Sequence, residues 1–408
     1  MQSTSANPRS KRGHIDHLAA RDLLLATDHG LPPHDAVAVA SHWLQDMGSP
    51  PIYGGEELKQ HWEDELKPHL ATSKLSVANR VPFPSRRQEF TFIDLFAGIG
   101  GFRIALQRLG GKSLFASEID PAAQRTYDEN FGAVPFGDIR DFTDASMSDA
   151  QIDQFIPTHD VLAAGFPCQP FSKAGVSARN ARGDVHGFDD DISGTLFFDI
   201  VRIARVKKPK VLFLENVKNL VSHDGGRTFS IIRTRLEGLG YHFEYSIINS
   251  ARLVPQRRVR TYIVASRLRP FQFDTRPFER GEEIPLESGL ESDVDPSFTI
   301  SDALWAGHRR RTKANIERGV GFTAFTADLA KPANTLVARY GKDGKECLVP
   351  QGPDNPRLLT PRECARLQGF PEKFLLPTAR TVAYRQFGNS VAVPVIYEIG
   401  KQIRNHLG

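Results

Sequence analysis

Cys168 has a residue type and a position that could do chemistry. It follows a short apolar run at residues 160–165 and stands in a loop between Pro167 and Pro170. A thiolate in such a turn can be stabilised by backbone dipoles and nearby cations, whereas most lone cysteines are small core residues. We therefore treat Cys168 as a candidate nucleophile whose role depends on the residues that lie beside it.

An acid and two cations stand next to other apolar runs. Glu215 and Asn216 follow the run at residues 211–214. Strand interiors rarely carry a glutamate, so Glu215 is a candidate general acid with a pKa raised by its surroundings. Arg258 and Arg260 stand two positions apart beside a further run, and this spacing puts both on one face of a strand. The sequence thus supplies a nucleophile, an acid and two guanidinium groups.

A glycine turn after the first apolar run indicates a second kind of site. Gly98 and Gly100 come directly after residues 92–96, and a helical pattern follows them. Glycines in such a turn let a ligand approach the backbone. Arg103 stands where the dinucleotide fingerprint has its third glycine, which argues against a clamp for a pyrophosphate.

Two acids further along the chain suit the sugar and the base of a nucleoside. Glu118 follows the apolar run at residues 113–117, where a carboxylate can accept from both ribose hydroxyls. Asp138 has a spacing suited to the end of the next strand and could accept from an adenine amine; alternatively, it caps a helix. The turn and the two acids together predict a nucleoside cofactor without phosphates, such as S-adenosylmethionine.

The alternation of short apolar runs with amphipathic segments predicts an α/β fold. Runs buried on both faces are typical of a largely parallel sheet that is covered by helices on each side, with ligands at the carboxyl ends of its strands. The expected strands lie at residues 90–96, 113–117, 160–165, 211–214 and 262–265.

Two regions depart from this regular pattern. Residues 15–70 predict two or three short helices, and the proline-containing stretch at residues 81–87 places a domain boundary near residue 88. Residues 267–356 are irregular, and helical patterns return at residues 361–369 and 380–407. The regular core therefore has an extension before it and an irregular segment within it.

Length and composition exclude several classes of protein. The 408 residues, 40% of them apolar and 25% charged, can bury an ample core and do not fit a collagen-like or disordered chain. No run approaches the roughly 20 apolar residues of a spanning helix, and the N-terminus lacks a secretory pattern, so we expect a cytoplasmic protein without a membrane partner. Three widely spaced cysteines suit neither a disulfide framework nor a zinc cluster, and no metal is expected.

The irregular segment is electrically divided, although the whole chain carries a net charge of only +4. Residues 274–302 hold nine acidic and two basic residues, and residues 303–345 hold nine basic and three acidic ones. Because phosphate contacts dominate the affinity of proteins for nucleic acids, the basic half could lie on DNA. Its candidate contacts are Arg309, Arg310, Arg339 and Lys342, and the alternative for the run at 309–311 is a solvated helix.

Six ordered blocks of the sequence resemble the bacterial DNA (cytosine-5) methyltransferases. The blocks are residues 96–100, 167–169, 215–217, 256–260, 362–371 and 388–391, and the resemblance covers roughly residues 90 to 408. It implies a doubly wound, mostly parallel sheet of the class that binds S-adenosyl-L-methionine. It also implies four parts: a helical extension (1–88), a catalytic domain (89–266), an inserted target-recognition domain (267–379) and a C-terminal segment that completes the catalytic domain (380–408).

The resemblance implies a role for each candidate of the catalytic set. Cys168 would add to carbon 6 of a cytosine flipped out of duplex DNA, which activates carbon 5 toward the methyl group. Glu215 would hold ring nitrogen 3 and share a proton with it. Arg258 and Arg260 would anchor the base, and Asn216 would fix the backbone next to them.

The resemblance also implies the cofactor residues. Phe96 would lie against the adenine, Glu118 on the ribose and Asp138 on the adenine amine, and Asn389 and Ser390 would close the methionine end. Ile119 departs from an aromatic residue common at its position, which should weaken adenine stacking. The other members of the expected site are Gly98, Gly100, Ile139 and Pro167.

Further stretches resemble the subgroup that modifies the inner cytosine of CCWGG, with related palindromes such as CCNGG left open. They are residues 172–187, 194–199, 216–220 and 338–344. We expect a monomer that acts on double-stranded DNA, with a cognate restriction endonuclease acting separately. The alternatives are a transfer-RNA cytosine-5 methyltransferase, which shares the core, and a catalytically silent DNA-binding regulator. The long irregular segment favours duplex DNA, and the presence of Cys168 and Glu215 argues against silence.

Overall fold

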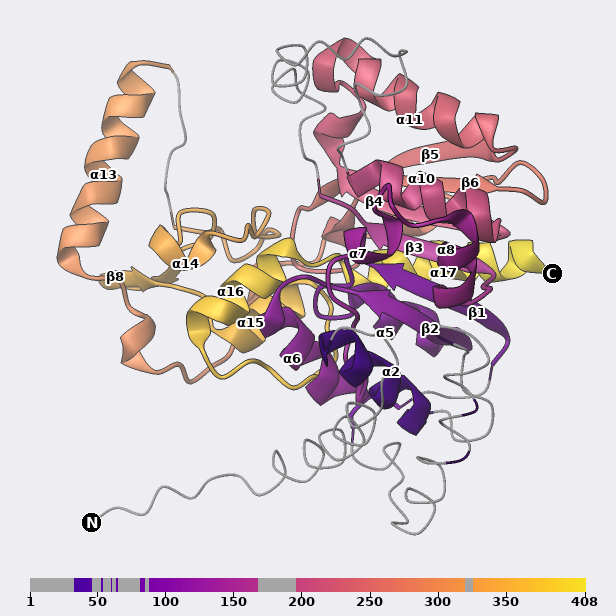
Figure 1. Cartoon of the computed structure of the whole chain (residues 1–408). Helices are drawn as coiled ribbons and strands as arrows, with labels where there is room; N and C mark the ends of the chain where they lie inside the picture. The colour runs from indigo at the N-terminus through magenta and orange to yellow at the C-terminus, as the bar shows by residue number, and fades with distance from the viewer. Residues whose placement is uncertain are drawn as a thin grey trace, which may run out of the picture.

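A sheet of six strands forms the centre of the computed structural model (Figure 1). The structure describes residues 33–45, 53, 60, 64, 81–84, 88–167, 196–319 and 326–408. Within them, the strands are β1 (Phe90–Leu95), β2 (Gly111–Ser117), β3 (Val161–Gly165), β4 (Val211–Val217), β5 (His242–Asn249) and β6 (Val259–Ser266). All five expected strands are confirmed, with ends that differ by a few residues.

The order of the strands places a binding site at one edge of the sheet. The order is β2-β1-β3-β4-β6-β5; β1 to β4 are parallel, and β6 is antiparallel to both of its neighbours. The chain starts at β1, moves out to β2 and then crosses to β3 on the other side. Ligands of doubly wound sheets bind beyond the carboxyl ends of the strands at such a switch point.

Strand β5 was not expected from the sequence. It forms the edge of the sheet next to β6, and only Phe243 and Ile248 of the strand are buried, without regular alternation. Tyr245 and Ile247 are apolar and yet 37% and 42% exposed. An edge strand packs on fewer neighbours than a central one, so its sequence carries a weaker hydrophobic pattern.

Alternate side chains of the central strands enter two apolar layers. Phe92, Ala163 and Phe213 lie in the layer with helices α5 (Gly101–Arg108) and α17 (Val393–Leu407). Ile93 and Leu162 lie in the opposite layer. That layer also contains α8 (Asp149–Phe155), α10 (Leu196–Lys207) and α11 (Arg227–Gly238). The predicted α/β fold with helices on both faces is therefore confirmed.

The irregular segment contains more regular structure than its sequence predicts. Its main element is α13 (Asp302–Glu317), a helix that starts where the Ser301 hydroxyl accepts from the Leu304 amide at 3.3 Å. Figure 1 shows α13 projecting away from the sheet, beyond the short strands β7 (Val349–Gln351) and β8 (Asp354–Arg357). Its shorter helices are α12 (Arg276–Glu279) and α14 (Tyr340–Asp343). The helices expected after the segment are present as α15 (Pro361–Leu367), α16 (Arg380–Asn389) and α17.

Helix α2 (Pro33–Gln45) belongs to the N-terminal extension and is one of the helices expected there. The other helices expected within residues 15–70 fall largely outside the described residues. Helices α6 (Pro121–Phe131) and α7 (Arg140–Thr143) follow β2. Asp138 was expected at the end of a further strand, but the structure has only a single parallel bridge there, between Ser117 and Phe136.

Gly388 in α16 is a point of close contact between two chain segments. A Cβ atom there would lie 2.3 Å from the carbonyl carbon of Val337 and 2.4 Å from the Ala338 nitrogen. Gly388→Ala should therefore lower the free energy of unfolding by on the order of 1–3 kcal/mol, because backbone cannot yield as a flexible side chain can. Urea denaturation measures this loss.

Gly238→Ala is the matched control, because a Cβ at this helical glycine meets nothing within 4 Å. It should leave the protein unchanged or stabilise it by up to about 0.5 kcal/mol, since alanine loses less entropy on folding. An unfolding midpoint of Gly388→Ala equal to that of the native protein would contradict the close contact.

Candidate functional site

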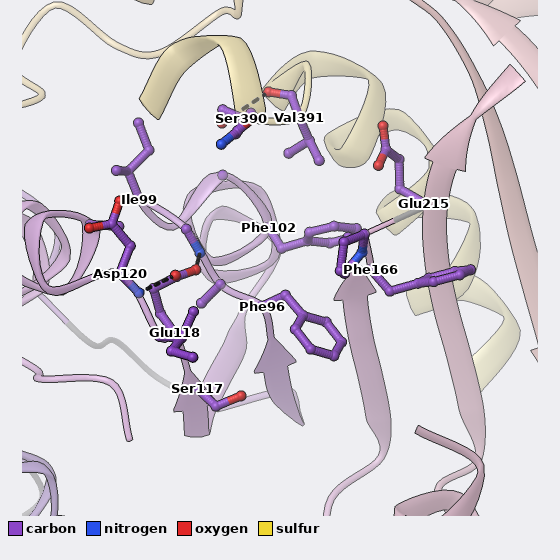
Figure 2. Close-up of a pocket in the computed structure, with 18 of the residues that line it drawn as sticks. Phe96, Ile99, Phe102, Ser117, Glu118, Asp120, Phe166, Glu215, Ser390 and Val391 are labelled. Atoms are coloured by element: carbon purple, nitrogen blue, oxygen red, sulfur yellow. Dashed lines mark hydrogen bonds between the residues drawn. The ribbon is translucent and has the colours of Figure 1, made fainter. Parts of the chain in front are cut away.

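One cavity joins the two groups of candidate residues. It encloses about 550 Å³ at the carboxyl ends of β1 to β4 and is closed on another side by residues of α16 and the segment after it. Figure 2 shows Glu118 and Glu215 on opposite sides of this space, with Phe96 and Phe102 between them. The pocket at the switch point of the sheet therefore has two ends, with Glu118 at one end and Glu215 at the other.

The glycine turn after β1 forms one wall. Phe96, Gly98 and Gly100 have φ angles of 57°, 55° and 85°, in the left-handed region. A Cβ on Gly98 would meet nothing within 4 Å, whereas one on Gly100 would lie 2.3 Å from the Phe131 ring. Gly98 thus keeps the pocket open, and Gly100, which does not line the pocket, lets the turn pack against α6.

Glu118 is held at the end of β2 by two backbone amides. Its carboxylate accepts from the Gly98 nitrogen and from the Asp120 nitrogen, both at 2.8 Å. Burial raises the pKa of the carboxyl, and the two amides oppose that rise. The acid is therefore oriented beside the turn, with the exposed side chain of Ile119 next to it at the pocket wall.

Asp138 and Ile139 also line this end of the pocket. The Asp138 carboxylate accepts from the Arg140 side chain at 2.9 Å and from the Arg140 amide at 3.0 Å. The side-chain hydrogen bond from Arg140 lowers the pKa of Asp138. Asp138 therefore lies at the pocket and binds the amide of the first residue of α7, although the N-cap position of that helix is Ile139. Its contact with an adenine amine stays a prediction.

Arg103 occupies the position of the missing third glycine without entering the pocket. Its guanidinium is buried, lies 4.6 Å from the centre of the Phe131 ring and donates to the Tyr127 hydroxyl at 3.2 Å. Asp94 of β1 lies near this charge, and burial raises the pKa of the Asp94 carboxyl to about 8 against the opposing effect of Arg103. Sequence reasoning found Arg103 only as a departure from the glycine pattern and missed Asp94.

Glu215 lies within β4, paired with Gly165 and Tyr262, rather than beyond the strand as expected. Only 8% of the residue is exposed, and its carboxylate lies 3.2 Å from the Arg260 guanidinium. Burial raises the pKa of Glu215, while the charges of Arg260 and Arg258 oppose the rise. The raised pKa predicted from the sequence is confirmed in direction.

Arg258 ties three chain segments together behind Glu215. Its guanidinium donates to the Leu336 carbonyl at 3.1 Å and to the Gly388 carbonyl at 3.3 Å. Burial lowers the pKa of Arg258 to about 10, and the nearby charge of Arg260 acts in the same direction. Since Arg258 and Arg260 both line the pocket, the prediction that they share one face is confirmed.

Asn216 fixes the backbone that leads to the candidate nucleophile. Its amide donates to the Phe166 carbonyl at 3.0 Å, directly before Pro167. Pro167 lines the pocket, and Cys168 itself lies outside the described residues. The other two cysteines, Cys347 and Cys364, are buried away from the pocket, and burial raises the pKa of the Cys347 thiol to about 12 and that of Cys364 well above its usual value.

The C-terminal part of the site comes from the end of α16. Asn389 and Ser390 line the pocket, as does Arg385, whose guanidinium lies 2.8 Å from the Asp120 carboxylate. Arg385 was missed from the sequence. Its spacing of four residues before Asn389 could have revealed it, because such positions share one face of a helix.

The candidate DNA contacts lie outside the pocket. Arg309 and Arg310 are exposed on α13, and the Arg309 guanidinium lies 5.7 Å from the centre of the Trp305 ring. Arg339 and Lys342 are exposed at α14. The basic run thus forms a solvated helix, and this surface remains accessible to a phosphate backbone.

Comparison with known proteins identifies the family. A model of the C-5 cytosine-specific DNA methylases matches residues 90–405. Type II methyltransferase M.SsoII of Shigella sonnei is 43% identical over 361 residues, which cover 86% of this chain and 90% of that protein. M1.ScrFI of Lactococcus lactis subsp. cremoris is 47% identical over 334 residues (79% and 80%). A DNA-cytosine methyltransferase of Escherichia coli K12 is 41% identical over 362 residues (76% and 77%).

Solved structures are similar in fold. The Dnmt2 methyltransferase of S. pombe has a TM-score of 0.59 and 19% identity over 78% of this chain and 99% of that one. The Entamoeba histolytica methyltransferase EhMeth has a TM-score of 0.57 and 21% identity, and the match covers 79% of this chain and 100% of that one. In the described part of the chain, no helix is long and apolar enough to cross a membrane.

The family model spans most of the sequence, and the relatives are aligned over most of their own lengths. Within the matched residues, the pocket brings together the glycine turn, the two acids and the two arginines. The chain therefore belongs to the C-5 cytosine-specific DNA methylases and is a DNA (cytosine-5) methyltransferase that uses S-adenosyl-L-methionine.

Proposed function

We propose that the enzyme methylates a cytosine that is flipped out of a short palindromic duplex site, through a covalent bond to Cys168. The observation that carries this proposal is the single pocket lined by Glu118 at one end and by Glu215, Arg258 and Arg260 at the other. A base stacked in a duplex cannot enter such a pocket, so it has to leave the helix first.

The residues present fit S-adenosyl-L-methionine. Glu118 would hold the ribose hydroxyls, Phe96 and Ile119 would contact the adenine, and Asp138 would accept from its amine. Gly98, Ile139 and Pro167 would complete this wall, and Asn389 and Ser390 would close the methionine end. Gly98 supports the fit, because the space where its Cβ would stand is open. When bound, the cofactor supplies the methyl group.

The proposed chemistry starts at carbon 6 of the cytosine ring. The thiolate of Cys168 forms a bond to carbon 6, and the electron pair of the 5,6 double bond becomes available at carbon 5. Carbon 5 would then take the methyl group as the bond between that group and the sulfonium sulfur of the bound cofactor breaks, and the electron pair of the broken bond would stay on the sulfur. Loss of the proton from carbon 5 restores the double bond and expels the Cys168 thiolate, so the enzyme returns to its starting state.

Glu215 would offset the charge that builds on the ring. A protonated carboxyl donates to nitrogen 3 as the thiolate adds, and burial keeps the proton on Glu215 at higher pH than an exposed glutamate would. Arg260 would anchor the base beside it. Arg258, whose guanidinium already binds two carbonyls, would hold the pocket wall.

For the target we propose CCWGG, with CCNGG as the alternative. The long segment with its exposed cations Arg309, Arg310, Arg339 and Lys342 would bind the duplex, and a pocket lined by residues of one chain fits an enzyme that acts as a monomer. The Type II methyltransferase names of the relatives support a cognate restriction endonuclease that acts separately. The same relatives favour DNA over transfer RNA as the substrate.

Bisulfite sequencing of plasmid from cells that express the chain tests the proposal directly. Protection should appear at the inner cytosine of each CCWGG site on both strands. Protection at every CCNGG site would replace the proposed target, and none at any site would contradict DNA methylation.

Cys168→Ala should abolish transfer of tritiated methyl groups to duplex DNA and leave the dissociation constant for S-adenosyl-L-methionine within about twofold. The reason is that the thiol forms the bond to the base and takes no part in holding the cofactor. Cys364→Ala is a control in which transfer persists, because that thiol is buried away from the pocket. Appreciable turnover by the Cys168 variant would refute the covalent route.

Glu215→Gln should remove a pH dependence of stability. Because the folded state raises the pKa of Glu215 above the ordinary 4.5, it binds the proton more tightly than the unfolded state does. The unfolding free energy of the native enzyme should therefore fall, relative to the Gln variant, as pH rises from about 4.5. Urea titrations at several pH values measure this difference, and a difference independent of pH would contradict the raised pKa.

The double variant Arg309→Ala/Arg310→Ala should weaken DNA binding and flatten its salt dependence. The plot of log affinity against log salt should lose up to about 2 units of slope, because each phosphate contact contributes about 0.9. The control is Arg205→Ala/Arg233→Ala, which removes two exposed cations from α10 and α11. Equal slopes for the native enzyme and the α13 variant would exclude α13 from the DNA contact.

A further inference from the structure

The N-terminal extension packs on the elements that carry two of the cofactor residues. Ala36, Ala38 and Val39 of α2 are fully buried in the apolar layer that also contains Phe115 and Phe136. Figure 1 shows α2 beside β2. An arrangement that buries this much apolar surface is a fixed part of the fold rather than a loose appendage.

Strand β2 has an irregularity at the place where the extension touches it. Phe92 pairs with Ser113 and Ile93 pairs with Phe115, so Leu114 is an extra residue of β2 without a partner on β1. β2 is also the edge strand of the sheet. A bulge redirects the residues that follow it, and here those residues lead directly to Glu118.

Tyr53 and His42 bind the carbonyl of the bulged residue. The Tyr53 hydroxyl donates to the Leu114 carbonyl, and His42 Nδ1 lies 2.7 Å from that hydroxyl and 3.3 Å from the same carbonyl. Because the carbonyl only accepts and the hydroxyl proton is already donated, Nδ1 must carry the hydrogen. The pair thus closes a hydrogen-bonded triangle on the edge of β2.

Ser41 binds the second element, the segment that leads to Asp138. Its hydroxyl donates to the Ala38 carbonyl and accepts from the Val134 amide, both at 2.8 Å. Two residues on, the Phe136 amide donates to the Ala116 carbonyl at 2.8 Å, and the Phe136 carbonyl accepts from the Glu118 amide at 2.9 Å. The segment is therefore held between β2 and the extension.

Aromatic contacts join these two attachments. The Phe136 ring stacks on Phe115 with centroids 4.5 Å apart, and the rings of Tyr53 and His42 lie 5.3 and 5.6 Å from it. The extension therefore contacts both β2, which leads to Glu118, and the segment at residues 134–138, which leads to Asp138. It does so from the side away from the pocket, since neither Ser41, His42 nor Tyr53 lines it.

We propose that α2 and Tyr53 form a positioning element that sets the separation of Glu118 and Asp138 for the nucleoside part of the cofactor. The proposal rests on the placement of S-adenosyl-L-methionine given above. Loss of either attachment should weaken cofactor binding and leave the chemistry at the cytosine end intact.

The test uses the full-length chain with the substitutions Tyr53→Phe and Ser41→Ala, singly and together. Titration calorimetry with S-adenosyl-L-methionine, without DNA, should show each single variant weakened by about threefold to tenfold, the factor that one buried hydrogen bond is worth. At saturating cofactor, kcat should stay within about twofold of the native value while KM for the cofactor rises.

Tyr241→Phe is the matched control. The Tyr241 hydroxyl donates to the Pro209 carbonyl at 2.9 Å in a buried site near β5, at the other end of the sheet. It should lower the melting temperature about as much as Tyr53→Phe and leave cofactor affinity unchanged. If Tyr241→Phe weakens binding equally, or if both extension variants bind like the native enzyme, the proposal is overturned.

Glu118→Ala distinguishes this inference from the proposed function. It should weaken cofactor binding more than any extension variant, because it removes an acceptor that would touch the ribose. If Glu118→Ala weakens binding and the extension variants do not, the positioning role fails and the cofactor placement stands. If Glu118→Ala binds like the native enzyme, the placement is wrong and the inference falls with it.

Discussion

A buried guanidinium needs acceptors wherever it lies, and in this enzyme Arg258 obtains them from distant segments. Its two carbonyl partners belong to Leu336 and Gly388, and the charge of Glu215 lies near it at the same end of the pocket. Removing one acceptor would leave a charge in the protein interior, which costs far more than one ordinary hydrogen bond. Arg258 therefore links the sheet, the segment after α13 and the end of α16, and Gln256 adds a second link by accepting from the Leu336 amide.

The two acids of the pocket are adjusted by different means. Burial raises the pKa of both Glu118 and Glu215. Hydrogen bonds from backbone amides oppose the rise of the pKa at Glu118. At Glu215, the positive charges of Arg260 and Arg258 oppose it. Amides leave an acid oriented as an acceptor, and cations next to a buried acid make its proton sensitive to small changes of charge. The first arrangement suits the binding of hydroxyl groups, and the second suits proton sharing with a ring.

Much of this architecture was predictable because it depends on local patterns. Apolar runs identified five of the six strands, and the spacing from Gly98 to Glu118 pointed to one wall of the pocket. Features that depend on tertiary contacts could not be predicted in this way. Strand β5 lies at an edge and has a weak hydrophobic pattern, and the bulge at Leu114 has no signature in the sequence. Asp94 is buried, but in the sequence it looks like any polar residue of a strand. Glu215 was found for the right reason but placed beyond a strand that in fact contains it.

The contacts that build the two halves of the pocket differ in range. The wall proposed for the nucleoside comes from pocket residues between 96 and 140, whereas the proposed methionine end also needs Asn389 and Ser390. The end of the pocket with Glu215 needs β4, β6 and the end of α16. The hydrogen bond from Arg258 to the Gly388 carbonyl joins segments that lie 130 residues apart in the sequence. Contacts between distant segments form late in folding, because closing a long loop first costs chain entropy. The nucleoside end therefore draws mainly on one region of the chain, with Arg385 bound to Asp120 as a long-range contact, whereas the reactive end depends on distant segments throughout.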